Sequence, residues 1–303
     1  MPFLGIEIAG RGSAVLMDGG HLRLFTGCGT LEAWDVIVLG DGPAALRSAA
    51  ESAKAGASTL LLCDNALGST SHFAQDGLAA PLQESNNRDH REDTIRSGAF
   101  LNDQDIVSLR TAAATRQVDL LERWGLTFRR DAQGLPMARK ALGHGKARNA
   151  DAGDATGREV QQILEEQCMR HGVTRRGDHL PLSLIHTNES VSGLTVIDTV
   201  NGRISALQAK AIIIADGGFE GAFTHGQVGL GLDLALRAGV PLRDMEFIAH
   251  SPLGIKDTNL MLPLGLLHDG ATLHEASGAD IEFGESSLDE VCQMISNAKQ
   301  PVL

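Results

Sequence analysis

The sequence has no tyrosine and few aromatic residues of any kind, which make up 4% of its 303 residues. It is also short of positive charge. Its 26 lysines and arginines stand against 38 aspartates and glutamates, a formal net charge of −12 at pH 7. Because a nucleic-acid-binding surface needs a cationic surplus to neutralise phosphates, this composition argues against nucleic acid as the main partner.

Cysteine is scarce and scattered. Cys28, Cys63, Cys168 and Cys292 show no C-x-x-C spacing, so the sequence predicts neither a zinc site nor a disulfide framework. We interpret each cysteine as a small buried hydrophobic residue, which is the usual role of an isolated thiol.

Long apolar runs are missing too. No stretch approaches the roughly 20 apolar residues of a membrane-spanning helix. Residues 1–12 lack the basic start and apolar stretch of a secretory signal. These absences predict a cytoplasmic protein with no direct membrane insertion.

What the sequence does contain is glycine, 35 residues of it, and 43% hydrophobic residues, a balance typical of an α/β enzyme. Residues 1–33 resemble a β-hairpin extension. After Trp34, residues 35–39 form an apolar, β-branched run, residues 44–55 are alanine-rich, and residues 59–63 are apolar again. This order predicts a βαβ unit within a parallel sheet.

The remaining pattern alternates helical and strand periodicity. Helical spacing extends over residues 92–125, and further helices are expected at residues 156–171, at residues 229–238 and after Glu285. Alternating residues over 180–214 predict a small antiparallel sheet ending in a buried strand. Residues 66–90 and 130–153 are expected to be loops.

The turn after the first strand carries a dinucleotide fingerprint. Gly40, Gly42 and Ala45 match G-x-G-x-x-G/A, in which the glycines allow a tight turn and close approach of a diphosphate. Pro43 and Ala44 would begin the helix whose amino end receives that anion.

An acidic residue is expected about 20 residues later, at the end of the second strand, to bind a ribose. Asp64 fits this role, although Cys63 is an alternative at the same place. The fingerprint alone also suits a nicotinamide-dependent reductase.

Further segments resemble the flavoprotein subunits of succinate dehydrogenase and fumarate reductase, and L-aspartate oxidase. They are residues 68–70 and 74–80 (A-Q-D-G-L-A-A), 92–98 (E-D-T-I-R-S-G), 154–158 (D-A-T-G-R), 213–218 (I-I-A-D-G-G) and 237–247. Their order and spacing, more than any one of them, carry the resemblance, and the segments after Asp64 favour a flavin over a nicotinamide cofactor.

The resemblance implies a Rossmann-type FAD-binding domain, α/β in class, with a central parallel sheet, a small antiparallel insertion and a capping domain that is largely missing. It implies an FAD-dependent oxidoreductase, because side chains alone cannot carry a hydride. Besides the fingerprint residues and Cys63 or Asp64, the residues implied to hold FAD are Ser69, Thr70, Gln75, Asp76, Gly77, Ala215, Asp216 and Gly217.

The chain departs from the family where the substrate binds. Ser251 and Leu253 replace a histidine and a threonine, and Leu267 replaces an arginine. A dicarboxylate needs cationic partners, so succinate or fumarate chemistry by the family mechanism is not expected. His250 and His268 are the candidate acid/base residues, with His250 alternatively a core histidine.

Two other features bear on the cofactor and the partner. His72 lies two positions too close to Ala74 for the covalent FAD link of the respiratory enzymes, so FAD is expected to bind without a covalent bond. The chain stops soon after the capping domain would begin, which predicts another subunit, or a second copy, completing the site. The expected organisation is residues 1–33 as the extension, 34–265 as the FAD domain and 266–303 as a cap remnant with a terminal helix.

His144, Lys146 and Arg148 lie in the glycine-rich loop of residues 130–153. They are expected either to contact substrate or FAD phosphates or to form a solvated basic loop. The rival to an oxidoreductase is a non-catalytic relative that serves as a scaffold or regulatory subunit.

Overall fold

The computed structural model describes most of the chain. The described residues are 13–18, 21–26, 32–63, 77–82, 86–153, 155–187, 190–223, 227–248, 253–255, 258, 262–268, 270–284 and 286–298. They fall into two compact units, which we call unit 1 (residues 1–70 and 164–247) and unit 2 (residues 71–163 and 248–303).

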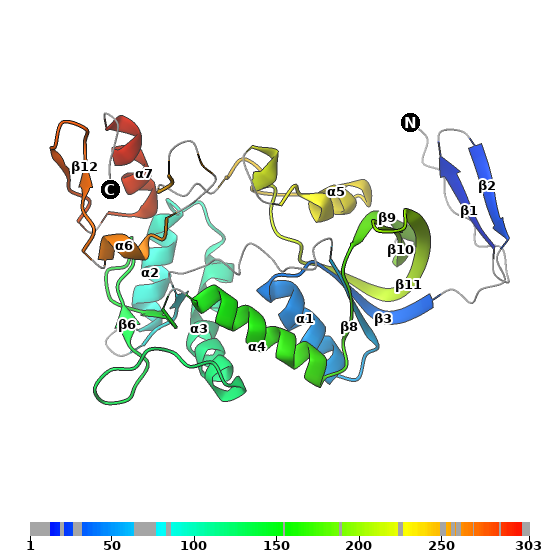
Figure 1. The fold of residues 1–303 in the computed structure, drawn as a ribbon, viewed down its shortest axis with the longest axis horizontal. Helices are drawn as coiled ribbons and strands as arrows, with labels where there is room; N and C mark the ends of the chain where they lie inside the picture. The colour runs from blue at the N-terminus through cyan, green and yellow to red at the C-terminus, as the bar shows by residue number, and fades with distance from the viewer. Residues whose placement is uncertain are drawn as a thin grey trace. The chain divides into compact units, whose positions relative to one another are not determined.

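The predicted βαβ unit lies in unit 1 (Figure 1). Strand β3 (Glu32–Leu39) leads into helix α1 (Pro43–Lys54), which returns the chain to β4 (Thr59–Leu62), parallel to β3. Every residue of β4 is buried, as expected for a strand covered on both faces. Helix α1 packs against β3 and β4, and its small buried alanines permit the close approach.

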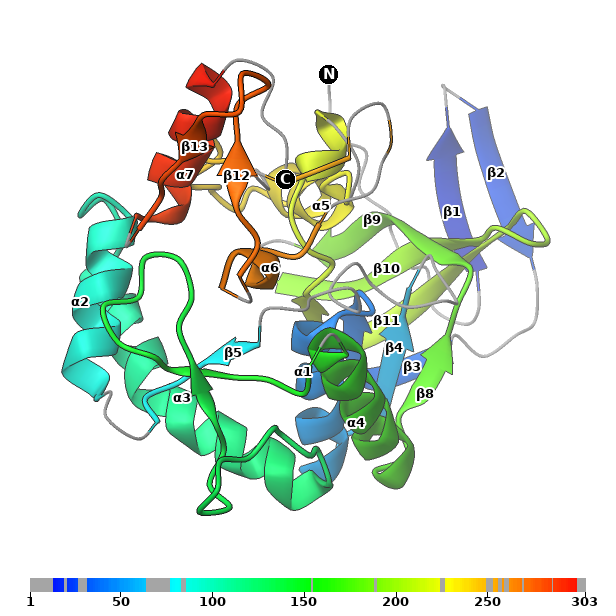
Figure 2. The same cartoon turned by 60° about the vertical axis from the view of Figure 1, so that its left-hand side comes forward.

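The central sheet has six strands in the order β8-β4-β3-β11-β10-β9 (Figure 2). Strands β8 (Thr174–Arg176), β4, β3 and β11 (Arg203–Ile214) run parallel, and β10 (Ser190–Asp198) and β9 (His179–Thr187) continue the sheet antiparallel. The long strand β11 pairs with β10 through its first half and with β3 through its second half. The predicted antiparallel strands therefore extend the central sheet.

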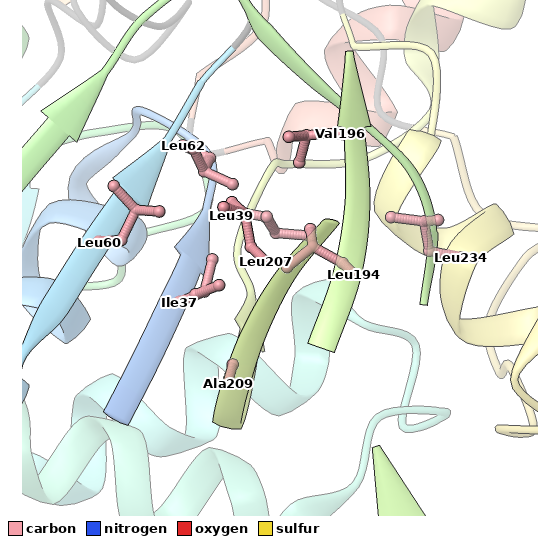
Figure 3. Packing of buried hydrophobic residues seen from close by; sticks show 9 residues of the cluster. All are labelled: Ile37, Leu39, Leu60, Leu62, Leu194, Val196, Leu207, Ala209 and Leu234. Carbon is pink, nitrogen blue, oxygen red and sulfur yellow. The ribbon is translucent and has the colours of Figure 1, made fainter. Parts of the chain in front are cut away.

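The core of unit 1 is apolar and lies along this sheet (Figure 3). The cluster combines residues of β3, β4, β10, β11 and helix α5 (Leu230–Arg237), namely Ile37, Leu39, Leu60, Leu62, Leu194, Val196, Leu207, Ala209 and Leu234. Each is at most 4% exposed. Because these side chains come from strands far apart in sequence, the core fixes the ends of β3 and β11 next to each other.

Four other elements lie wholly or partly in unit 1. Strands β1 (Ser13–Asp18) and β2 (His21–Thr26) pair as an antiparallel hairpin. Helix α4 (Thr156–Arg170) matches the predicted helix and begins in unit 2. A short 3-10 helix, η2 (Glu220–Ala222), precedes α5.

In unit 2, two helices replace the continuous helical stretch predicted for residues 92–125. Helix α2 (Asn87–Ser97) begins inside the expected loop, and α3 (Gln104–Trp124) follows after a break. At the break, Ala99 and Phe100 adopt left-handed backbone angles, φ 48° and 62°. The Asn102 side chain donates to the Thr94 carbonyl at 2.9 Å, which closes the end of α2.

The rest of unit 2 consists of short elements. Three two-residue strands, β5 (Leu78–Ala79), β6 (Ala138–Arg139) and β7 (Asn149–Ala150), form a small antiparallel sheet. Helix α6 (Gly265–His268), the strand pair β12 (Leu273–His274) and β13 (Asp280–Ile281), and the predicted terminal helix α7 (Leu288–Asn297) complete it.

Within the described ranges, no helix combines the length and the apolar character needed to cross a membrane. The same ranges contain no group of three or more histidine, cysteine or acidic residues that could hold a metal ion.

Candidate functional site

The turn between β3 and α1 requires glycine at its first position. Gly40 has φ +120°, and a Cβ atom there would lie 2.3 Å from the Ala215 carbonyl oxygen and 2.9 Å from the Asp216 Cα. Its amide donates to the Leu62 carbonyl at 2.9 Å, while the Ala215 amide donates to the Leu39 carbonyl at 2.9 Å. The fingerprint turn and the loop after β11 are therefore in direct backbone contact.

The amino end of α1 is left open. Gly42 is its N-cap residue, no side chain caps the helix, and its first turn holds no acidic residue. The first intrahelical bond runs from the Leu46 amide to the Gly42 carbonyl. The preceding amides thus have no partner within α1, and Pro43 contributes none.

Three other helices of the described chain have a side-chain cap at this end. Asn86, Asp103 and Ser287 each cap their own helix, α2, α3 and α7, with a side-chain oxygen. Such caps satisfy amides that would otherwise attract an anion. The open, positive end of α1 suits a diphosphate, and Ala44 is exposed there while Ala45 is buried against the sheet.

The loop after β11 contains three of the predicted cofactor residues. Ala215 contacts the turn as described, and Gly217 has φ +91° with no room for a Cβ atom beside the Gln227 side chain. The Asp216 carboxylate turns toward α5 and accepts the Gly231 amide at 2.6 Å. Ala215 and the Asp216 Cα therefore lie against the turn, whereas the Asp216 side chain is hydrogen-bonded to α5 and Gly217 lies beside Gln227.

Cys63 directly follows β4 and is buried, 4% exposed. Its amide donates to the Arg176 carbonyl, its carbonyl accepts the His179 amide, and its thiol lies 3.7 Å from the Arg176 carbonyl. Cys63 therefore links β4 to the β8–β9 connection. The alternative ribose ligand Asp64, together with Ser69, Thr70, Gln75 and Asp76, falls outside the described residues.

Gly77 lies in unit 2, before β5. Its φ is +88°, and a Cβ atom would lie 2.7 Å from the Ala150 carbonyl oxygen and 3.1 Å from the Asp151 Cβ. Strand β5 begins directly after Gly77 and pairs with β7. A glycine is needed here because the chain passes so close to β7.

Next to β7 in the sequence, a charged residue is buried. Arg148 is fully buried and forms an ion pair with Asp93 of α2. Asp93 also accepts the Gly145 amide at 2.9 Å and pairs with Arg96 at 3.2 Å. Burial opposes ionisation of Asp93, but the Gly145 amide and the Arg148 guanidinium outweigh it and hold its pKa below the ordinary value.

This arrangement corrects one sequence-based expectation. Arg148 was expected either to contact a ligand or to be solvated, but a fully buried side chain paired with Asp93 does neither. Lys146 instead lies near the surface and pairs with Asp89 at 2.9 Å. Sequence reasoning missed the Asp93–Arg148 pair, because residues 130–153 were expected to be a loop and no local pattern marks one of its basic residues as buried.

A second buried carboxylate, Asp151, follows β7. Its side chain is inaccessible to solvent and lies 3.3 Å from Arg129 Nε and 3.6 Å from an Arg139 nitrogen. It also accepts the Gly153 amide at 2.8 Å. These bonds fix the segment between β7 and α4, which carries the predicted D-A-T-G-R motif.

The two candidate acid/base histidines are less defined. His250 falls outside the described residues, and His268 is the last residue of α6, with only its backbone described. The neighbouring Leu253 and Leu267 are 5% and 6% exposed and share an apolar cluster with Leu273. The positions where a threonine and an arginine were looked for are thus packed in a hydrophobic core.

Comparison with known proteins agrees with this geometry. The sequence model of the FAD binding domain family matches residues 35–300. The chain is 30% identical over 254 residues to the fumarate reductase flavoprotein subunit of Haemophilus influenzae, covering 80% of this chain and 42% of that protein. It is 31% identical over 264 residues to the succinate dehydrogenase flavoprotein subunit of Rickettsia felis, covering 81% and 44%.

Solved structures give the same result. An E. coli quinol fumarate reductase matches with a TM-score of 0.77 and 28% identity, over 81% of this chain and 44% of that one. A quinol-fumarate reductase structure with menaquinol matches with a TM-score of 0.81 and 25% identity, over 88% and 51%. The chain therefore spans less than half the length of the curated relatives named above.

The residues at the turn fit the group that these relatives share. An uncapped helix whose first turn holds no acidic residue, entered through a glycine turn, suits the diphosphate of a dinucleotide. The family match covers well over half of the chain. The chain belongs to the FAD-binding domain family, with FAD as its cofactor, alongside the flavoprotein subunits of fumarate reductase and succinate dehydrogenase.

Proposed function

We propose that this chain is the FAD-binding part of an oxidoreductase that transfers a hydride or electrons between FAD and a substrate or partner. The open amino end of α1, closed on one side by the loop after β11, is the observation that supports this most directly. The flavin supplies the redox chemistry when bound, and the chain binds and orients it.

Specific roles follow from this proposal. The amides of Gly42, Ala44 and Ala45 bind the diphosphate, and Pro43 presets the first helical turn. A larger set would complete the flavin site. It comprises Gly40, Cys63 or Asp64, Ser69, Thr70, Gln75, Asp76, Gly77, Ala215 and Gly217.

We further propose that the substrate is neither succinate nor fumarate. Leu253 and Leu267 occupy the positions where the resemblance places a threonine and an arginine, and both are buried in an apolar cluster. Leucine cannot pair with a carboxylate or relay a proton. His250 and His268 are the proposed proton donors and acceptors.

The same apolar cluster gives the rival proposal, a non-catalytic scaffold or regulatory subunit, its best support. The two proposals differ in FAD turnover. Photoreduced flavin in the purified protein should be reoxidised by an acceptor faster than free flavin if the chain is an oxidoreductase. Reoxidation no faster than that of free flavin would favour the scaffold.

We also propose that the chain works with another subunit or a second copy of itself. The relatives described above are named as flavoprotein subunits. Light scattering on the purified flavoprotein would show a mass above that of one chain if a second copy suffices. A monomer that binds FAD fully and turns over without any partner would contradict the proposal.

The decisive variant for the cofactor site is Gly42→Glu. A carboxylate at this position would place bulk and negative charge against the diphosphate, so FAD should not remain bound. Ala55→Glu adds the same charge at the exposed far end of α1 and serves as the control. Full FAD occupancy in Gly42→Glu would show that the diphosphate binds elsewhere.

Precipitation with trichloroacetic acid tests the mode of attachment. We expect all flavin in the supernatant, because His72 is not spaced for a covalent link. Flavin retained in the protein pellet would overturn this proposal.

A further inference from the structure

Asp216 joins two parts of unit 1. Its Cα lies against Gly40, where a Cβ atom would come within 2.9 Å. Its carboxylate reaches the other way and accepts the Gly231 amide in the first turn of α5 at 2.6 Å. The residue therefore bridges the diphosphate-binding turn and a helix that begins 14 residues later in the sequence.

Helix α5 depends on this contact for its amino end. Its N-cap residue is Gly229, with φ +77°, which has no side chain to accept an amide. At Gly231, a Cβ atom would lie 2.1 Å from Asp216 Oδ1 and 2.3 Å from Ile214 Cγ2. Glycine at position 231 thus makes room for the carboxylate, which takes the place of the missing N-cap side chain.

The charge of Asp216 has a second consequence. A carboxylate next to a turn that binds a diphosphate repels that anion, and the helix amino end under it offsets part of the repulsion. Removing the charge and removing the hydrogen bond should therefore act on FAD in opposite directions.

We infer that Asp216 is a positioning residue rather than an FAD ligand: its carboxylate fastens α5 to the loop that closes the diphosphate turn. The inference rests on the proposed diphosphate site. It replaces the expectation from the sequence that Asp216 contacts FAD directly. Asp216 acts on the cofactor through the backbone of residues 215–217 and through its charge.

Two substitutions separate these effects. Asp216→Asn keeps an oxygen that can accept the Gly231 amide but removes the charge, so FAD should bind about two- to fivefold more tightly, the size of one charge–dipole contribution. Asp216→Ala removes both, and the freed loop should weaken FAD binding by about fivefold or more.

The experiment is a titration of the apoprotein of each variant with FAD, together with hydrogen exchange of the Gly231 amide. Asp233→Asn is the control, because Asp233 lies on α5 with the same charge but pairs with Arg237 at 2.9 Å. It should leave the FAD Kd unchanged. Exchange at Gly231 should accelerate only in Asp216→Ala.

Two outcomes would overturn the inference. Weaker FAD binding in Asp216→Asn would identify the carboxylate as a direct ligand. Unchanged hydrogen exchange at Gly231 in Asp216→Ala would show that the carboxylate does not hold the Gly231 amide. The exchange measurement needs no FAD. If the wild-type protein fails to bind FAD, the proposed diphosphate site is refuted, and hydrogen exchange still tests the bond between Asp216 and α5 separately.

Discussion

Units 1 and 2 each hold a short glycine-containing segment in place, but through different interactions. In unit 1 the diphosphate turn rests on strands whose core residues are apolar and almost fully buried. In unit 2 the segment around Gly77 pairs with short strands next to ion pairs. The buried Arg148 pairs with Asp93, and the buried Asp151 pairs with Arg139 and the half-exposed Arg129. Unit 2 should therefore respond more strongly to the loss of a single buried charge.

The largest expected effect is on the buried ion pair. Asp93→Asn leaves the fully buried Arg148 without its anion, which should destabilise unit 2 by about 3–5 kcal/mol. The two tryptophans report the units separately, because Trp34 lies in β3 and Trp124 in α3. The Trp34→Phe and Trp124→Phe proteins, each with and without Asp93→Asn, would be unfolded with denaturant. The fluorescence of the remaining tryptophan would then give the stability of each unit.

Glu92→Gln on the same helix is the matched control, because Glu92 forms an exposed pair with Arg88. This substitution should barely change the denaturant midpoint of the unfolding transition that Trp124 reports. Equal losses from the two substitutions would mean that burial does not distinguish the two pairs.

The next effect tests unit 1 at its turn. Gly40→Ala combines a left-handed backbone with a Cβ atom 2.3 Å from a carbonyl oxygen, so it should cost about 2–4 kcal/mol and abolish FAD binding. Gly56→Ala has φ +93° but nothing within 4 Å. It should cost only about 1 kcal/mol and keep FAD.

Thermal unfolding and FAD titration of both glycine variants would measure these effects. If Gly40→Ala binds FAD like the wild type, the contact between the turn and the loop after β11 is not needed for the cofactor.

The smallest effect is the dependence of unit 2 on acid. The pKa of Asp93 in the folded chain lies below its ordinary value of 3.8. The stabilisation from its ionised form is therefore complete above that value and is lost as the pH falls through the folded-state pKa. The Trp124 transition should weaken below about pH 4, and Asp93→Asn should flatten this dependence.

The comparison also explains what the sequence could predict. The βαβ unit was predictable because residues 35–39 and 59–63 are continuous apolar runs and because the Gly40–Gly42 turn is a local motif. The proposed diphosphate site follows from that short segment. Helix α4 was likewise predictable from residues 156–171.

Non-local features were not predictable in the same way. The pair of Asp93 and Arg148 joins residues 55 positions apart, and no local pattern indicates that a charged side chain will be buried. The break between α2 and α3 was missed because Ala99 and Phe100 adopt left-handed angles that neither residue type suggests. The burial of Leu253 with Leu267 likewise depends on tertiary packing.

The visible absorption spectrum of the purified protein tests the central claim, that this chain holds FAD, most directly. The account predicts flavin bands at about 370 and 450 nm, from the cofactor that carries the redox chemistry. Both bands should disappear from Gly42→Glu. A colourless wild-type protein that takes up no added FAD would contradict the account and favour a fold retained without its cofactor.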